Sequence, residues 1–151
     1  MIDMDSILYN IKRFIPNTLL QKVRPLYHLL LSYAGAVWYR HPSQYLTVVA
    51  VTGTKGKSTV TEMTAHLLRT HGFKVASLST IRFMIDEEET PNLFKMTTPG
   101  RFFVQRFLRQ AVDDGCTHVV LEMTSEGAKQ FRHRFIEFDA LIFTNLSPEH
   151  I

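Results

Sequence analysis

The residues best suited to chemistry stand in one short segment, VTGTKGKST, which runs from Val51 to Thr59. Gly53 and Gly56 would let the backbone turn tightly and bring its amide groups close to an anion. The ammonium group of Lys57 would neutralise phosphate charge, and the hydroxyl of Ser58 suits a magnesium ion. The segment therefore predicts a site for a nucleoside triphosphate with Mg²⁺. The alternative is a glycine turn followed by a helix-capping serine.

The spacing of the two glycines differs from that of the standard phosphate loop, G-x-x-x-x-G-K-[ST], which would require glycine in place of Val51. The pattern here is G-x-x-G-K-S, and a pattern this short also occurs by chance. Its context favours phosphate binding, because a β-branched apolar run precedes it at Leu46–Val51 and a helical pattern follows at Ser58–His71. A buried strand that leads through a glycine loop into a helix presents backbone amides to an anion.

Apolar runs and helical patterns alternate along the chain after residue 45. Strands are predicted at 46–51, 74–80, 117–123 and 139–144, and helices at 58–71, 101–114 and 126–134. This alternation predicts βαβ units, and hence an α/β fold with a parallel sheet flanked by helices, similar to P-loop NTPases. The acidic run Asp86–Glu89 is predicted to be a solvated loop or the tip of a hairpin.

One carboxylate, Glu122, comes at the end of an otherwise apolar predicted strand. Parallel sheets bind their ligands at the carboxyl ends of strands, and Mg²⁺ prefers hard oxygen ligands. Glu122 is therefore a candidate magnesium ligand together with Ser58. The alternative is a carboxylate exposed at a strand end.

Residues 1–45 form a separate helical segment in this interpretation, with breaks predicted at Pro16 and Pro25 and a linker at 41–43. The apolar stretch Leu26–Tyr39 is shorter than the roughly 20 residues that a membrane-spanning helix needs. We expect a helix packed against the domain. The alternative is a weak membrane-surface contact through residues 18–40, because basic residues precede the stretch and aromatic residues end it.

The composition is that of an ordinary globular protein. The chain has 151 residues, of which 45% are hydrophobic and 21% are charged, so one domain is expected and a disordered tail or collagen-like repeat is excluded. The net charge of +3 is too small to indicate nucleic-acid binding. A single cysteine, Cys116, cannot form an internal disulfide and fits the reducing cytoplasm.

Four motifs in order make residues 46–151 resemble the Mur ligase family, the ATP-dependent amide-forming enzymes of peptidoglycan synthesis. The motifs are TGTKGKST at 52–59, Thr97-Thr98-Pro99, Leu121-Glu122-Met123-Thr124-Ser125 and Thr144-Asn145-Leu146-Ser147-Pro148-Glu149-His150. The last three resemble the branch that adds the third amino acid to UDP-N-acetylmuramoyl-dipeptide. The resemblance implies a central ATP-binding domain, here partial, spanning residues 46–151.

The resemblance also implies an activity: a carboxylate of the nucleotide-linked peptide is activated as an acyl phosphate and attacked by an amino acid. It assigns catalysis to Lys57, Glu122 and His150, and magnesium to Ser58, Glu122 and His150. Nucleotide contacts fall on Gly53, Thr54, Lys55, Gly56, Lys57, Ser58, Thr59 and Asn145, the last of which would also anchor the turn before His150. Substrate contacts fall on Thr97, Thr98, Thr124 and Ser125. Thr97 and Thr98 would meet the substrate's phosphate or sugar, with capping of the helix at 101–114 as the alternative.

Two residues depart from the family's pattern: Lys55 stands where asparagine is usual, and Glu126 where histidine is usual. The rest of the central domain and the C-terminal domain would lie beyond Ile151, so a missing C-terminal portion is expected in cis or in trans. The alternatives are a non-catalytic nucleotide-binding module or split subunit, and another P-loop NTPase.

Overall fold

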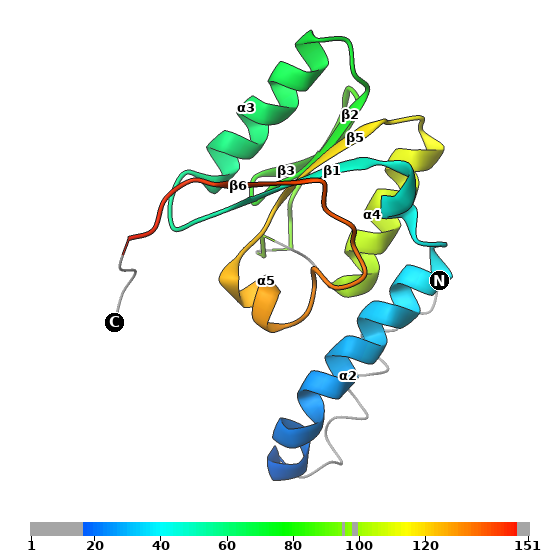
Figure 1. Cartoon of the computed structure of the whole chain (residues 1–151), viewed down its shortest axis with the longest axis vertical. Helices are drawn as coiled ribbons and strands as arrows, with labels where there is room; N and C mark the ends of the chain where they lie inside the picture. The colour runs from blue at the N-terminus through cyan, green and yellow to red at the C-terminus, as the bar shows by residue number, and fades with distance from the viewer. Residues whose placement is uncertain (1–16, 95, 98–99, 148–151) are drawn as a thin grey trace.

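The computed structural model describes residues 17–147 except 95, 98 and 99, with side chains from Leu26 onward (Figure 1). The following predictions lie outside these residues: the helical structure of residues 1–16 with its break at Pro16, the substrate contact of Thr98, and the catalytic and metal-binding roles of His150.

Six strands form one sheet in the order β4-β3-β2-β5-β1-β6. Four of them are parallel: β1 (Thr47–Thr52), β2 (Val75–Leu78), β5 (His118–Glu122) and β6 (Ala140–Phe143). They correspond to the four predicted strands, so the predicted α/β fold with a parallel sheet is confirmed. The carboxyl ends of β1, β2 and β5 lie together at one edge of the sheet, where a ligand site is expected.

Two further strands, β3 (Arg82–Ile85) and β4 (Glu88–Pro91), extend the sheet as an antiparallel hairpin. Asp86 and Glu87 form its tip, which agrees with the predicted hairpin tip. Glu88 and Glu89 instead begin β4, so half of the acidic run belongs to an edge strand. Charged residues and proline on this edge oppose pairing with another chain.

Helices cover both faces of the sheet (Figure 1). Helix α3 (Lys57–Thr70) covers one face and α4 (Arg101–Asp113) the other. Residues of β1 point alternately to these two layers: Val48 packs in the cluster with the α4 residues, and Val51 packs in the cluster with the α3 residues. A strand buried on both faces needs apolar residues at successive positions, which explains the continuous apolar run in the sequence.

Helix α2 (Asn17–Trp38) continues through Pro25, so the predicted break at this proline is wrong. Proline lacks an amide hydrogen, so Pro25 within α2 removes one helical hydrogen bond. The rest of α2 packs against α4 and the chain after α5 (Ser125–Lys129). Ser32 donates to the carbonyl oxygen of Phe131 at 2.9 Å, and Gly35 lies against Gln105. This packing outweighs the lost hydrogen bond.

The opposite face of α2 carries an exposed apolar stripe. Leu26, Leu30, Tyr33 and Val37 follow helical spacing and are 48% to 57% exposed. The described part of the chain contains no helix with the length and apolar character needed to cross a membrane. A 3-10 turn (Pro42–Tyr45) joins α2 to β1, close to the predicted linker.

Helix α5 is shorter than the predicted helix over 126–134. Turns occupy residues 130–135, and Phe131 adopts a left-handed φ of 57°, which ends a regular helix. The guanidinium group of Arg101 donates to the carbonyl oxygen of Gln130 at 3.0 and 2.7 Å. The predicted helix is therefore confirmed only in its first part, and this tertiary contact stabilises a turn in place of the rest.

The thiol of Cys116 is 5% exposed within the core beneath α4. Burial raises its pKa, so little of the reactive thiolate forms near neutral pH. We expect Cys116 in the folded protein to react with iodoacetamide more than tenfold slower than in urea-unfolded protein, as followed by mass spectrometry. Equal rates in both states would contradict the buried position of Cys116.

Candidate nucleotide-binding site

The phosphate-loop segment connects β1 to α3 at the carboxyl edge of the parallel strands. Gly53 and Gly56 adopt φ values of 135° and 77°, which L side chains rarely adopt. A Cβ added at Gly53 would overlap Oγ1 of Thr144 and lie 2.9 Å from the carbonyl oxygen of Asn145. The first amides of α3 lack partners within the helix, so they suit an anion. The expected strand–loop–helix unit is therefore present.

The chain after β6 holds this loop in place. The amide of Thr54 donates to the carbonyl oxygen of Asn145 at 3.0 Å, and the amide of Lys55 donates to Oδ1 of the same asparagine at 3.0 Å. The side-chain amide of Asn145 and the hydroxyl of Thr144 both donate back to the carbonyl oxygen of Lys55, at 3.0 and 2.8 Å. The hydroxyl of Thr54 also donates to the carbonyl oxygen of Ser147 at 3.2 Å and accepts from the amide of Ser147 at 3.0 Å.

These contacts bear on the predicted role of Asn145. Its side chain binds the main chain of the loop, and it is not among the residues that line the adjacent cavity. Thr144 and Ser147 make similar contacts and were missed by the sequence reasoning. The available signal was their position after β6, which is the strand beside β1.

A cavity of about 320 Å³ opens in front of the loop. Residues 54–59 line one side of it, and the other side is lined by Thr80, Thr97, Glu122 and Thr124. The ammonium group of Lys57 donates to the carbonyl oxygens of Gly53 and Thr54 at 2.9 and 2.8 Å. It therefore stands at the loop, where the charge of a bound phosphate would be placed.

Glu122 is 2% exposed at the end of β5, directly beside Val51 of β1. Both of its carboxylate oxygens accept hydrogen bonds from Thr80: Oε2 from the amide at 2.8 Å and Oε1 from the hydroxyl at 3.0 Å. Thr80 was missed by the sequence reasoning, although it follows β2, the strand beside β5. The carboxylate is thus buried and fixed in orientation, and Ser58 lines the same cavity.

The candidate substrate residues lie in different places. Thr97 lines the cavity, and its hydroxyl lies 2.8 Å from that of Thr80. The helix-capping alternative for Thr97 does not hold, because Gly100 precedes α4 without a side-chain cap. Thr124 lines the cavity and also caps α5 by accepting from the amide of Gly127 at 3.1 Å. Ser125 is exposed at the start of α5 and is not among the lining residues.

The two residues that depart from the family's pattern, Lys55 and Glu126, are both exposed. Lys55 is exposed at the rim of the cavity, with its backbone tied to Asn145. Glu126 is exposed on α5, and its carboxylate accepts a hydrogen bond from the side-chain amide of Gln130 at 2.6 Å.

The donors around the cavity fit a nucleoside triphosphate with magnesium. Backbone amides and an ammonium group suit phosphate oxygens, and the hydroxyl of Ser58 and the carboxylate of Glu122 are hard oxygen ligands. Within residues 17–147, apart from the three omitted positions, His, Cys, Asp and Glu side chains do not gather in threes to hold a metal ion. Magnesium keeps several waters, so two protein ligands suffice for it.

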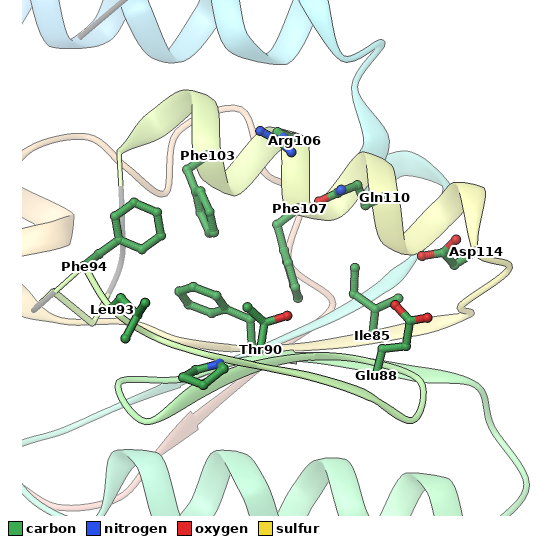
Figure 2. Close-up of a pocket in the computed structure, with 12 residues that line it drawn as sticks. Ile85, Glu88, Thr90, Leu93, Phe94, Phe103, Arg106, Phe107, Gln110 and Asp114 are labelled. Carbon is green, nitrogen blue, oxygen red and sulfur yellow. The ribbon is translucent and has the colours of Figure 1, made fainter. Parts of the chain in front are cut away.

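A larger cavity, of about 500 Å³, lies between the β3–β4 hairpin and α4 (Figure 2). Its interior is aromatic: the ring centroid of Phe103 lies 5.0 Å from the ring centroid of Phe83 and 4.9 Å from that of Phe94. Polar groups such as Arg106 and Glu88 also line it. It contains neither the phosphate loop nor Glu122, so the smaller cavity is the better candidate for phosphate chemistry.

The glycine loop between a parallel strand and a helix, facing a buried carboxylate, is the arrangement of a P-loop NTPase-like fold. Within this class, the model of the Mur ligase middle domain matches residues 51–151. The chain therefore belongs to the Mur ligase family, and the resemblance drawn from the four motifs is confirmed.

Curated relatives carry names from the branch predicted from the sequence. The chain is 40% identical over 117 residues to UDP-N-acetylmuramyl-tripeptide synthetase 2 of Oceanobacillus iheyensis, covering 78% of this chain and 24% of the relative. It is 36% identical over 118 residues to UDP-N-acetylmuramoyl-L-alanyl-D-glutamate--2,6-diaminopimelate ligase of Bacteroides fragilis, with the same coverage. The chain thus spans about a quarter of the length of these relatives.

A solved structure gives the same result for the fold. The structure of a UDP-N-acetylmuramoyl-L-alanyl-D-glutamate--2,6-diaminopimelate ligase is similar with a TM-score of 0.65 and 30% identity. The match covers 78% of this chain and 24% of that chain.

Proposed function

We propose that this chain supplies the nucleotide-binding part of an ATP-dependent ligase of peptidoglycan precursor synthesis, located in the cytoplasm. The ligase would activate the carboxylate of UDP-N-acetylmuramoyl-dipeptide for attack by an amino acid. The observation that carries the proposal is the cavity in which the phosphate loop, Glu122 and Thr97 face one another. The names of the relatives supply the substrate class.

The roles of the residues follow from their chemistry. The amides of residues 54–59 and the ammonium group of Lys57 would bind and orient the phosphates of ATP. Ser58 and Glu122 would hold Mg²⁺, which would reduce the negative charge that keeps the phosphates and the substrate carboxylate apart. Thr97 and Thr124, on the opposite wall, would contact the muramoyl substrate. Asn145 would support the site by holding the loop rather than by touching the nucleotide.

The proposal includes a division into a helical segment, 1–45, and a partial central domain, 46–151, which acts with a further portion in cis or in trans. The difference between the two edges of the sheet supports the presence of a further portion. Edge strand β4 carries glutamates and Pro91, whereas β6 is apolar, with Leu141 and Phe143 exposed by 65% and 58%. An apolar edge strand without charged residues or proline is suited to pair with further polypeptide.

Phosphate release from MgATP by the full natural polypeptide tests the proposed activity. The ligase requires release that depends on both UDP-N-acetylmuramoyl-dipeptide and an amino acid. Release that is independent of these substrates would indicate another P-loop NTPase. Nucleotide binding without turnover would indicate a non-catalytic module.

A weak membrane-surface contact through residues 18–40 is a separate proposal, supported by the exposed apolar stripe of α2. Co-sedimentation with anionic phospholipid vesicles is expected to bring a salt-sensitive fraction of the protein into the pellet. Replacing Leu30 and Tyr33 with serine should reduce this fraction. Absence of the unaltered protein from the pellet at low salt would contradict the contact.

A further inference from the structure

We propose that Thr80 is a positioning residue that orients the Glu122 carboxylate and links it to Thr97, so that Thr97 presents a hydrogen-bond acceptor to the substrate. This inference rests on the proposed magnesium-nucleotide function of the cavity. It adds a residue that no motif contained, and it specifies the kind of substrate group that Thr97 would meet.

Thr80 binds the carboxylate of Glu122 at two points. Its amide and its hydroxyl contact different oxygens of the carboxylate, at 2.8 and 3.0 Å. Two contacts from one residue restrict rotation of the carboxylate about its terminal bond. Glu122 is 2% exposed, so removal of a donor from this buried carboxylate costs free energy.

The hydroxyl protons of Thr80 and Thr97 decide which residue donates in each contact. A hydroxyl has one proton to donate, and a carboxylate oxygen accepts. The hydroxyl of Thr80 therefore donates to Glu122, and the 2.8 Å contact with Thr97 is made by donation from Thr97 to Thr80. The proton of Thr97 is then engaged, and its free lone pairs are left for the cavity. Thr97 would accept from a sugar hydroxyl or a peptide amide of the substrate, rather than donate to a phosphate oxygen.

The turn that carries Thr80 is itself held in place by hydrogen bonds. The neighbouring Ser79 is fully buried, and its hydroxyl donates to the carboxylate of Glu62 on α3 at 2.9 Å. The same carboxylate accepts from the guanidinium group of Arg82 at 3.0 and 2.8 Å. These bonds raise the pKa of Arg82, and they tie the turn after β2 to the helix that begins at the phosphate loop. Thr80 is thus held at a defined place relative to both Glu122 and the loop.

The test compares Thr80→Val with Thr80→Ser, using a fluorescent non-hydrolysable ATP analogue and titrated Mg²⁺. Valine keeps the shape and the backbone amide but removes the hydroxyl, whereas serine keeps the hydroxyl. We expect Thr80→Val to raise the Mg²⁺ concentration for half-maximal binding about tenfold, with the metal-free affinity unchanged. Thr80→Ser is expected to stay within about twofold of the unaltered protein.

The outcomes separate the inference from the function on which it rests. If the unaltered protein binds the analogue without any effect of Mg²⁺, the proposed function fails. If Mg²⁺ acts on the unaltered protein and Thr80→Val has the same Mg²⁺ requirement, the positioning role fails. Should Thr80→Val not fold, Thr97→Val provides the second test, because loss of its donation to Thr80 should raise the Mg²⁺ requirement about threefold. An unchanged requirement in Thr97→Val would overturn the proposed link.

Discussion

Replacing Lys57 with alanine is expected to weaken MgATP binding at least about 100-fold, or roughly 2.7 kcal/mol. The Lys57 ammonium group lies within 2.9 Å of two loop carbonyl oxygens, at the place where phosphate charge would be neutralised. Alanine removes this charge and keeps the helical backbone, since alanine favours helices. Isothermal titration calorimetry with a non-hydrolysable ATP analogue measures the change.

The matched control is Lys129→Ala. Lys129 is exposed in the last turn of α5, so its replacement removes the same charge from a helix without touching the loop. Its nucleotide affinity is expected to equal that of the unaltered protein. A Lys57→Ala protein that folds and binds MgATP as tightly as the Lys129→Ala control would contradict the assignment of the phosphate loop.

Replacing Gly53 with alanine is expected to reduce the free energy of unfolding by about 3 kcal/mol and to remove nucleotide binding. The new Cβ would overlap the hydroxyl of Thr144 and lie 2.9 Å from the carbonyl oxygen of Asn145, at a φ of 135°. The chain after β6 would have to move away, and this would release the hydrogen bonds that hold the loop. Urea unfolding measures the loss of stability.

Gly56→Ala separates steric overlap from backbone strain. Gly56 has a φ of 77°, but a Cβ there would find no atom within 4 Å. The expected loss is about 1 kcal/mol, which is the cost of a left-handed conformation alone. If the two variants lost equal stability, contact with residues 144–147 would not explain the requirement for glycine at position 53.

The fold was largely predictable because it depends on local patterns. The strand from Thr47 to Thr52 is buried on both faces along its middle, so residues 48–51 form a continuous apolar run that is easily recognised. Local patterns also explain the two errors, the break predicted at Pro25 and the excessive length predicted for α5. Tertiary packing by Ser32 and Arg101 decided these two elements, and neither contact is visible in a local pattern.

The candidate site was predictable only in part. Glu122 ends a strand, and Lys57 and Ser58 begin the helix that follows another strand. Their types and positions therefore predict that the three side chains lie at the same edge of the sheet. Thr80 is recognisable only once β2 is known to lie beside β5, because no motif contains it. The role of Asn145 also depends on the sheet order, since β6 lies beside β1 and brings this side chain to the back of the loop.

The most direct test of the central claim is to map, by amide NMR, where an ATP analogue with Mg²⁺ binds on the ¹⁵N-labelled chain. The largest shift changes are expected at residues 54–59, Thr80 and Glu122, around the smaller cavity. These changes should disappear in Lys57→Ala. Changes confined to Phe83, Phe103 and Phe107 around the larger cavity, or no changes at all, would contradict the central claim.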